Sequence, residues 1–272
     1  MANSTKDKIL GLLLRAGGNF ISGEDAGKSL GISRSAVSTA VKALRDDGFA
    51  IESVTNRGYS LSKLPDNIGK GTLLAGLPPE RTDRVLCLPV TGSTNSCLME
   101  LAQKDAPDGQ VVIAEMQTAG RGRSGKSFAS PDGKGIYLSY LIRPDSGGGE
   151  SPFLNDWDFI TGAVGRTVSS VLKKLCGISP EISENELLVN NRKLCGILTQ
   201  TDMEIESGMF RALVTGIGIN VHQEKTELDH KDNMTSLDIE TSRRNKRPEI
   251  TAALILALDE LRLKIRQGSR GL

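Results

Sequence analysis

Apolar residues recur at helical spacing in three short stretches near the start of the chain, and these stretches predict three helices. The first spans 5–15, the second 25–30 after Ser22, and the third 34–46 after Ser33. A serine in front of a helix accepts a hydrogen bond from its first free amides, so both serines are expected N-caps. Beyond residue 48, apolar positions alternate around a turn at 56–58, which predicts a hairpin. This order is typical of a winged helix-turn-helix.

From residue 84 onward, alternating runs and longer helical runs predict a mixed sheet with helices packed on it. Six strands are expected, at 85–90, 111–116, 136–142, 187–189, 194–199 and 210–221, and three helices, at 94–102, 156–175 and 248–265. The fold class is therefore α+β. We expect a winged helix-turn-helix domain at 1–64, a turn-rich linker at 65–83 and a second domain at 84–272.

Composition and charge exclude several classes of protein. The 272 residues carry a net charge of +1, with +3 in residues 1–64, and no apolar run approaches the ~18 residues of a membrane span. Four well-separated cysteines fit a reducing compartment, so we expect a cytoplasmic protein with no membrane partner. Only two histidines are present, and no protein-bound metal site is expected.

The third predicted helix has the composition of a DNA-reading helix. Short hydroxyls and cations on its outer face can reach phosphates and base edges in a major groove, namely Arg34, Ser35, Ser38, Thr39 and Lys42. Arg57 lies at the tip of the predicted wing. A charge of +3 gives weak non-specific binding, so useful specificity for a DNA site requires a dimer. The alternative is a small helical domain that binds another protein.

A glycine-rich segment follows the strand predicted at 111–116. Residues 120–127 fit the Walker A pattern, but Pro131 and nearby glycines leave no room for the helix that a P-loop needs. We therefore interpret the match as coincidence. Arg121, Arg123 and Lys126 instead form a flexible cationic loop suited to binding anions.

Five motifs in order resemble those of the bifunctional biotin protein ligase/biotin operon repressor family. They follow the winged helix as Ser93–Asn95, the Glu115–Arg123 segment, the Ser130–Ser139 segment, Arg192–Leu198 and Gly216–Val221. The resemblance implies ATP-dependent activation of biotin to biotinoyl-5′-AMP. It then implies transfer to a lysine of the biotin carboxyl carrier protein, a subunit of acetyl-CoA carboxylase. It also implies adenylate-dependent repression of biotin genes by a homodimer on operator DNA, and Mg²⁺ accompanying ATP.

The same resemblance implies roles for individual residues. The catalytic residues would be Lys193, Arg123 and Arg121. Biotin would contact Ser93, Thr94, Asn95, Gln117, Gly120, Arg121, Arg123, Lys193 and Gly196. ATP or the adenylate would contact Arg123, Lys126, Phe128, Asn185, Glu186 and Asn220.

The chain departs from the family pattern in ways that leave alternatives open. The segment 182–186 keeps Asn185 and a carboxylate at Glu186 but lacks the family's Lys, Trp and Pro. Phe128 replaces a Trp, and Lys126 replaces an Arg. A C-terminal β-barrel domain is expected to be lacking or truncated. One alternative is a non-catalytic, biotin-sensing DNA-binding regulator, and another is a related ligase for lipoate or another acyl group.

Overall fold

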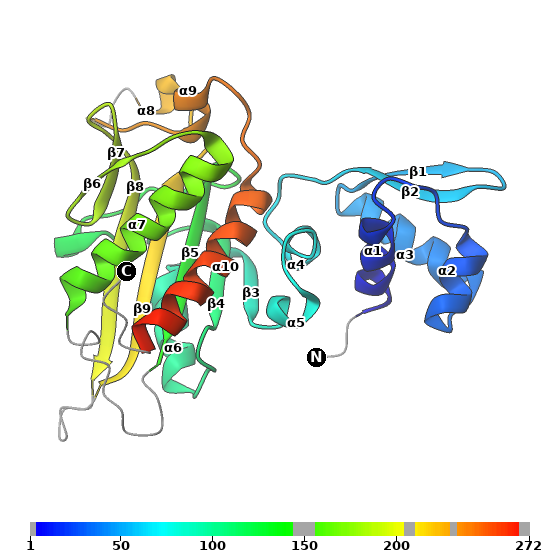
Figure 1. Cartoon of the computed structure of the whole chain (residues 1–272), viewed down its shortest axis with the longest axis horizontal. Helices are drawn as coiled ribbons and strands as arrows, with labels where there is room; N and C mark the ends of the chain where they lie inside the picture. Colours follow the sequence, from blue (N-terminus) through cyan, green and yellow to red (C-terminus); the bar gives the residue numbers. More distant parts are fainter. Residues whose placement is uncertain (1–3, 144–155, 204–209, 229–232, 267–272) are drawn as a thin grey trace.

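A computed structural model describes residues 4–143, 156–203, 210–228 and 233–266 (Figure 1). The N-terminal unit consists of α1 (Thr5–Arg15), α2 (Gly23–Leu30), α3 (Arg34–Asp46) and the hairpin of β1 (Ala50–Val54) and β2 (Gly58–Lys63). Ser22 and Ser33 accept hydrogen bonds from first-turn amides of α2 and α3, as expected of N-caps. The winged helix-turn-helix prediction is confirmed.

The segment expected to be a turn-rich linker contains two short helices, α4 (Lys70–Leu73) and α5 (Pro79–Thr82). Ile68, Leu73 and Leu77 are buried in the core of the larger unit. Leu74 packs against the core of the N-terminal unit instead, and a Cβ at Gly71 would lie 3.2 Å from the Phe49 ring. Leu73, the last residue of α4, and the adjacent Leu74 thus contribute to different cores.

The larger unit is built on one seven-stranded mixed sheet, with strand order β3-β4-β5-β9-β8-β7-β6. The strands are β3 (Val85–Thr91), β4 (Val111–Gln117), β5 (Gly135–Ile142), β6 (Glu181–Ser183), β7 (Glu186–Val189), β8 (Arg192–Met203) and β9 (Phe210–Asn220). Only β3 and β4 pair in parallel, and α6 (Thr94–Gln103) connects them; the other neighbours are antiparallel. The α+β prediction is confirmed.

Helices cover both faces of this sheet. The long helices α7 (Trp157–Cys176) and α10 (Arg247–Arg266) pack on one face, where most of the buried apolar residues lie (Figure 1). On the other face, α6 buries Leu98 and Ala102 against β4, β5 and β9. Two short helices, α8 (Lys225–Leu228) and α9 (Leu237–Thr241), follow β9. In the described segments, none of the helices is both long and apolar enough to span a membrane.

A charged cluster centred on Arg247 fixes the segment between the two units to the sheet. The buried Arg247 guanidinium donates to Glu115 at 2.7 Å and to Asp66 at 3.0 Å, and the Ile68 amide also donates to Glu115. The ring nitrogens of His222 lie 2.7 Å from carboxylate oxygens of Asp66 and Asp238. Burial raises the pKa of Asp66, but hydrogen bonds from His222 and Arg247 outweigh burial and hold that pKa below its usual value.

We predict that Arg247→Ala lowers the free energy of unfolding by roughly 3–5 kcal/mol, because it leaves Glu115 and Asp66 without their cation in a partly buried site. Urea denaturation followed by circular dichroism measures this loss. Lys246→Ala serves as the matched control, since the neighbouring Lys246 side chain is 81% exposed, and it should leave stability unchanged. Equal midpoints for Arg247→Ala and the parent chain would contradict the role of the cluster.

Candidate functional site

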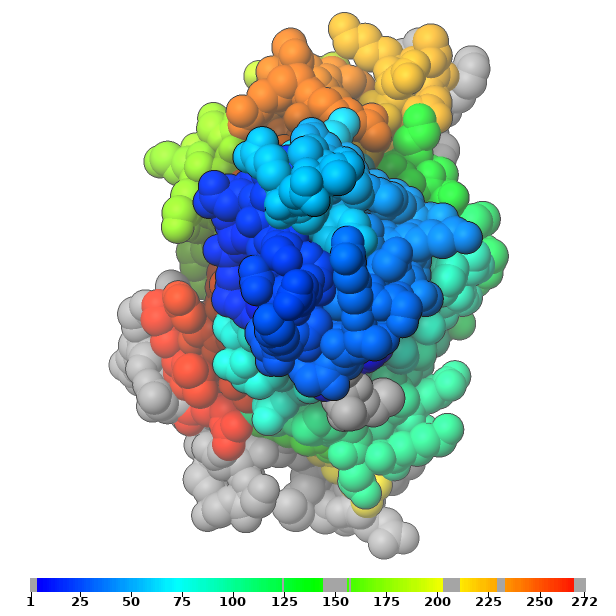
Figure 2. Space-filling model, turned by 90° about the vertical axis from the view of Figure 1, so that its right-hand side faces the viewer, coloured from blue at the N-terminus to red at the C-terminus, as the bar shows by residue number. Residues whose placement is uncertain are grey.

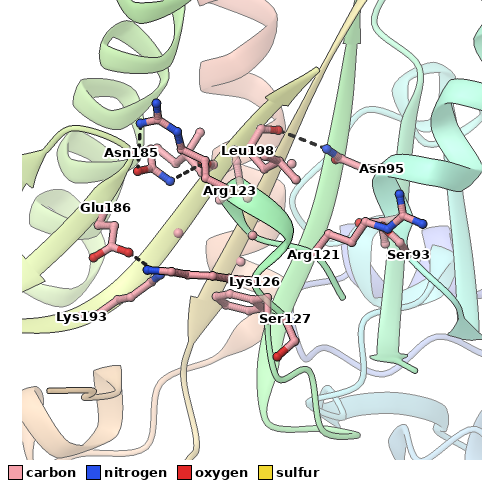
Figure 3. A pocket seen from close by; sticks show the side chains of 18 of the residues that line it. Ser93, Asn95, Arg121, Arg123, Lys126, Ser127, Asn185, Glu186, Lys193 and Leu198 are labelled. Carbon is pink, nitrogen blue, oxygen red and sulfur yellow. Dashed lines mark hydrogen bonds and ion pairs between the residues drawn. The ribbon is translucent and has the colours of Figure 1, made fainter. Parts of the chain in front are cut away.

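A cavity of about 490 Å³ opens beside the carboxyl ends of the parallel strands β3 and β4. The N-terminus of α6 and the segment after β4 form one end of it, and β7 and β8 form the other (Figure 3). Ligand sites in sheets with parallel strands commonly occur at this edge. The cavity therefore lies at the edge of the sheet where the loop after β4 and the N-terminus of α6 come together.

The floor of the cavity is open because β9 has glycines in place of larger residues on the face that lines it. Ala212 and Val214 pack against the α6 layer, and the next two residues on that face are Gly216 and Gly218. A Cβ at Gly218 would lie 2.5 Å from the Phe128 ring. Because these glycines have no side chains, there is room above β9 for the Phe128 ring and for the cavity.

Uncharged polar groups gather at the α6 end of the cavity. The Gln117 Oε1 atom accepts from the Thr94 amide at 2.8 Å and from the Thr94 hydroxyl at 3.1 Å, while Nε2 donates to Ser130 at 2.7 Å. The Ser93 hydroxyl accepts from the Ser96 amide and keeps its own proton. This end can therefore offer both hydrogen-bond donors and acceptors without a formal charge.

Asn95 lines the same end, but its side-chain amide is already hydrogen-bonded to other groups of the protein. Its Nδ2 donates to the Leu198 carbonyl at 3.1 Å and to Gln200 at 2.9 Å, and its Oδ1 accepts from Ser139 at 2.6 Å. A Cβ at Gly216 would lie 2.3 Å from Asn95 Oδ1. In this arrangement Asn95 joins α6 to β8 across the bare backbone of β9 (Figure 3).

The cationic loop forms the open side of the cavity. Arg121, Arg123 and Lys126 are exposed and line it, and a bridge between Arg121 and Ser127 closes the loop on itself. Residues 123–125 form one short 3-10 turn, and the backbone is extended at Lys126. No α-helix starts at Lys126 and Ser127, so the interpretation of the Walker A match as coincidence is confirmed.

Lys193 lies at the end of the cavity opposite Ser93. Its Nζ is 2.6 Å from Glu186 and 5.9 Å from the centre of the Phe128 ring (Figure 3). Arg123 approaches the neighbouring segment, at 3.3 Å from Glu184 and 3.4 Å from Asn185. Two cations and two carboxylates of this chain thus meet at this end of the cavity.

Most of the residues that the resemblance implies lie around this one cavity, and two do not line it. Gly120 is buried beneath the loop, where a Cβ would lie 2.3 Å from the Phe128 carbonyl oxygen. Asn220 is also buried, and its amide donates to the Thr235 carbonyl and accepts from Gln223. The sequence reasoning missed several further lining residues, namely Gly122, Ser127, Ser183, Glu184, Ile197, Leu198 and Gly216–Gly218.

The thiol beneath the cavity is unsuited to nucleophilic chemistry. Burial raises the pKa of Cys195 to about 12, although the nearby Lys193 acts in the opposite direction, so the thiol stays protonated near neutral pH. Among the residues that the structure describes, no group of three His, Cys, Asp or Glu side chains is arranged to hold a metal ion.

The residues expected on the outer face of α3 are accessible to solvent in the structure. Arg34, Ser35, Ser38, Thr39 and Lys42 are all exposed. At the wing tip, Arg57 is exposed and its guanidinium lies 4.3 Å from the centre of the Phe20 ring. Seen from its own side of the molecule, the N-terminal unit (blue) stands in front of the larger unit (Figure 2).

Two family models match the chain. The model described as the biotin/lipoate A/B protein ligase family matches residues 87–220, and the model described as an HTH domain matches residues 5–60. The first range contains the whole cavity lining, and the second contains the helix-turn-helix.

Curated relatives and a solved structure cover both units or the larger one. The bifunctional ligase/repressor BirA of Bacillus subtilis is 33% identical over 264 residues, which cover 96% of this chain and 79% of that protein. BirA of Escherichia coli is 33% identical over 226 residues, covering 83% and 66%. The biotin protein ligase of Aquifex aeolicus, solved with biotin and ATP, is 25% identical with a TM-score of 0.55 and covers 68% of this chain and 72% of that one.

Proposed function

The chain belongs to the bifunctional biotin protein ligase/biotin operon repressor family, and from this premise we propose how its cavity works. In the proposed reaction, biotin and ATP form biotinoyl-5′-AMP, and the biotinoyl group passes to a lysine of a biotin carboxyl carrier protein. The setting is the cytoplasm, where the four free cysteines remain reduced.

One observation carries this proposal: a single cavity holds an uncharged donor–acceptor group at one end and cations at the other. Ser93, Thr94 and Gln117 match the ureido ring of biotin, which offers N–H donors and a carbonyl acceptor. The carboxylate of the valeryl chain then extends toward Lys193. A dithiolane ring has neither group, and this favours biotin over lipoate.

The adenylation step requires two anions to meet. The biotin carboxylate attacks the α-phosphorus of ATP, pyrophosphate leaves, and a mixed anhydride results. Lys193 would neutralise charge on the carboxylate and α-phosphate, while Arg121, Arg123 and Lys126 fold over the phosphates. Phe128 would stack on the nucleotide, with Asn185, Glu186 and Asn220 near it. Mg²⁺ would accompany ATP and be held mainly by phosphates and water. The carrier lysine then attacks the acyl carbon, and AMP leaves.

A second candidate function has its own supporting observation. Glu186 and Glu184 contact Lys193 and Arg123, the two cations that the adenylation step needs most. If these contacts persist with ligands bound, the chain is a biotin-sensing DNA-binding regulator that does not turn over. The two functions differ in one measurable property, the synthesis of the adenylate.

We predict biotin-dependent exchange of labelled pyrophosphate into ATP by the parent chain and none with lipoate. Lys193→Ala should lower the exchange rate by at least 100-fold, because the two anions lose their shared cation. Lys173→Ala is the control, since that lysine is exposed on α7. Absence of exchange with biotin, while calorimetry still shows biotin binding, would favour the regulator. Exchange with lipoate would contradict the assignment of biotin.

For the N-terminal unit, we propose that a homodimer reads operator DNA through α3. Arg34→Ala combined with Lys42→Ala should weaken operator binding at least tenfold, because two phosphate contacts per protomer are lost. Fluorescence anisotropy measures the affinity, and Lys28→Ala on α2, outside the reading face, is the control.

Analytical ultracentrifugation with biotin and ATP should show a dimer at lower protein concentration than without them. The same sedimentation coefficient in both conditions, across a range of concentrations, would contradict adenylate-dependent dimerisation. Pyrophosphate exchange by the Arg34→Ala, Lys42→Ala variant should equal that of the parent chain, since the cavity is unaffected.

A further inference from the structure

A buried hydroxyl on β5 lies directly behind the polar end of the cavity. Ser139 is fully buried, and its Oγ lies 2.8 Å from Thr94 Oγ1 and 2.6 Å from Asn95 Oδ1. Among the described residues it does not line the cavity, so it has no direct contact to offer a ligand. Any effect of Ser139 on binding must therefore pass through Thr94 and Asn95.

The orientations of the Gln117 and Asn95 side-chain amides follow from their backbone partners, because a backbone N–H can only donate and a carbonyl can only accept. The Thr94 amide can only donate, so the Gln117 atom that faces it must be Oε1. The Leu198 carbonyl can only accept, so Asn95 must present Nδ2 to it and Oδ1 to Ser139. The amide orientations of both Gln117 and Asn95 are thus determined by backbone groups.

Counting protons then assigns a role to each hydroxyl. The Thr94 hydroxyl donates to Gln117 Oε1, so only its lone pairs remain for the cavity. The single proton of Ser139 faces two acceptors, Thr94 Oγ1 and Asn95 Oδ1, so the two contacts share it as one three-centre hydrogen bond. Gln117 Nε2 donates one of its two protons to Ser130, and the second remains available to a ligand. The cavity therefore receives an acceptor from Thr94 and a donor from Gln117.

We propose that Ser139 is a positioning residue that determines the specificity of the cavity for a cyclic urea. By holding Thr94 and Asn95, it keeps the Thr94 acceptor and the Gln117 donor side by side, which matches an N–H group next to a C=O group. This inference rests on the proposed function, because it takes the ligand of this cavity to be biotin. Gly216 is part of the same arrangement, since a side chain there would displace Asn95.

The test measures binding by calorimetry for biotin and for 2-iminobiotin, in which a protonated nitrogen replaces the ureido oxygen and turns an acceptor into a donor. The parent chain should strongly prefer biotin. Ser139→Ala should weaken biotin binding about tenfold, as expected for the loss of one hydrogen-bond anchor, and reduce the preference over 2-iminobiotin. The KM for ATP in pyrophosphate exchange should stay unchanged, whereas general damage to the fold would alter both.

Two further variants keep the test interpretable. Ser139→Thr retains the hydroxyl and should restore most of the preference for biotin over 2-iminobiotin. Thr251→Val removes another fully buried hydroxyl, one without a hydrogen-bond partner in the described structure, and should leave both affinities unchanged. If Ser139→Ala does not fold, Ser139→Cys replaces it, because a thiol is a weak donor of similar size and should give an intermediate loss.

The outcomes separate this inference from the proposed function. If the parent chain binds biotin but Ser139→Ala and Ser139→Cys retain its affinity and its preference within twofold, the inference is wrong and the proposed function stands. An equal loss of biotin and 2-iminobiotin affinity would also overturn the inference, because specificity would then be unaffected. If the parent chain does not bind biotin at all, both the proposed function and the inference fail.

Discussion

The cavity depends on the approach of Asn95 to the bare backbone of Gly216. This contact allows the amide of Asn95 to reach across β9 and bond to β8, which brings the N-terminus of α6 to one end of the cavity floor. The same approach places Thr94 next to Gln117 and both in front of Ser139. A side chain at position 216 would displace the Asn95 amide group and break its bonds to β8.

The second structural constraint is the charged cluster around Arg247, and it relates the cavity to the N-terminal unit. Asp66 belongs to the segment between the units, and His222 follows directly after β9, two residues from Asn220. The chain after β9 returns to pair with the cavity, since the Thr235 amide donates to the Lys193 carbonyl. One connected set of hydrogen bonds therefore extends from the Lys193 backbone to the segment that carries α4, where the two cores meet.

Much of the fold follows from local patterns that the sequence shows directly. Caps at Ser22 and Ser33, the apolar runs of β5 and β9, and Pro131 after the glycine loop each determine structure within a few residues, so these predictions are confirmed. The helices α4 and α5 were not predicted, because four residues are too few to show a periodicity of their own. Tertiary contacts stabilise them: α4 packs on α10 and β3, and Arg81 of α5 pairs with Asp259 of α10.

Less of the candidate site could be predicted from the sequence, because its contacts join residues that lie far apart in the chain. The family resemblance implied Asn95 and Asn220 as ligand contacts, but it gave no sign of the hydrogen bonds that both amides make within the protein. The pairing of Lys193 with Glu186 depends on the β7–β8 register, which no spacing in the sequence specifies. Ser139 closes the Ser130–Ser139 motif, but the motif indicates no role for it, and the proposed role rests on its burial behind Thr94.

The central claim is that one cavity holds biotin with its ring at Thr94 and Gln117 and its carboxyl end at Lys193. A crystal structure of the chain with a non-hydrolysable analogue of biotinoyl-5′-AMP tests this most directly. The account predicts the ureido ring within hydrogen-bond distance of Thr94 and Gln117 and the phosphate beside Lys193, with Glu186 displaced from that lysine. A ligand bound elsewhere, or bound with its ring at Lys193, would contradict the account.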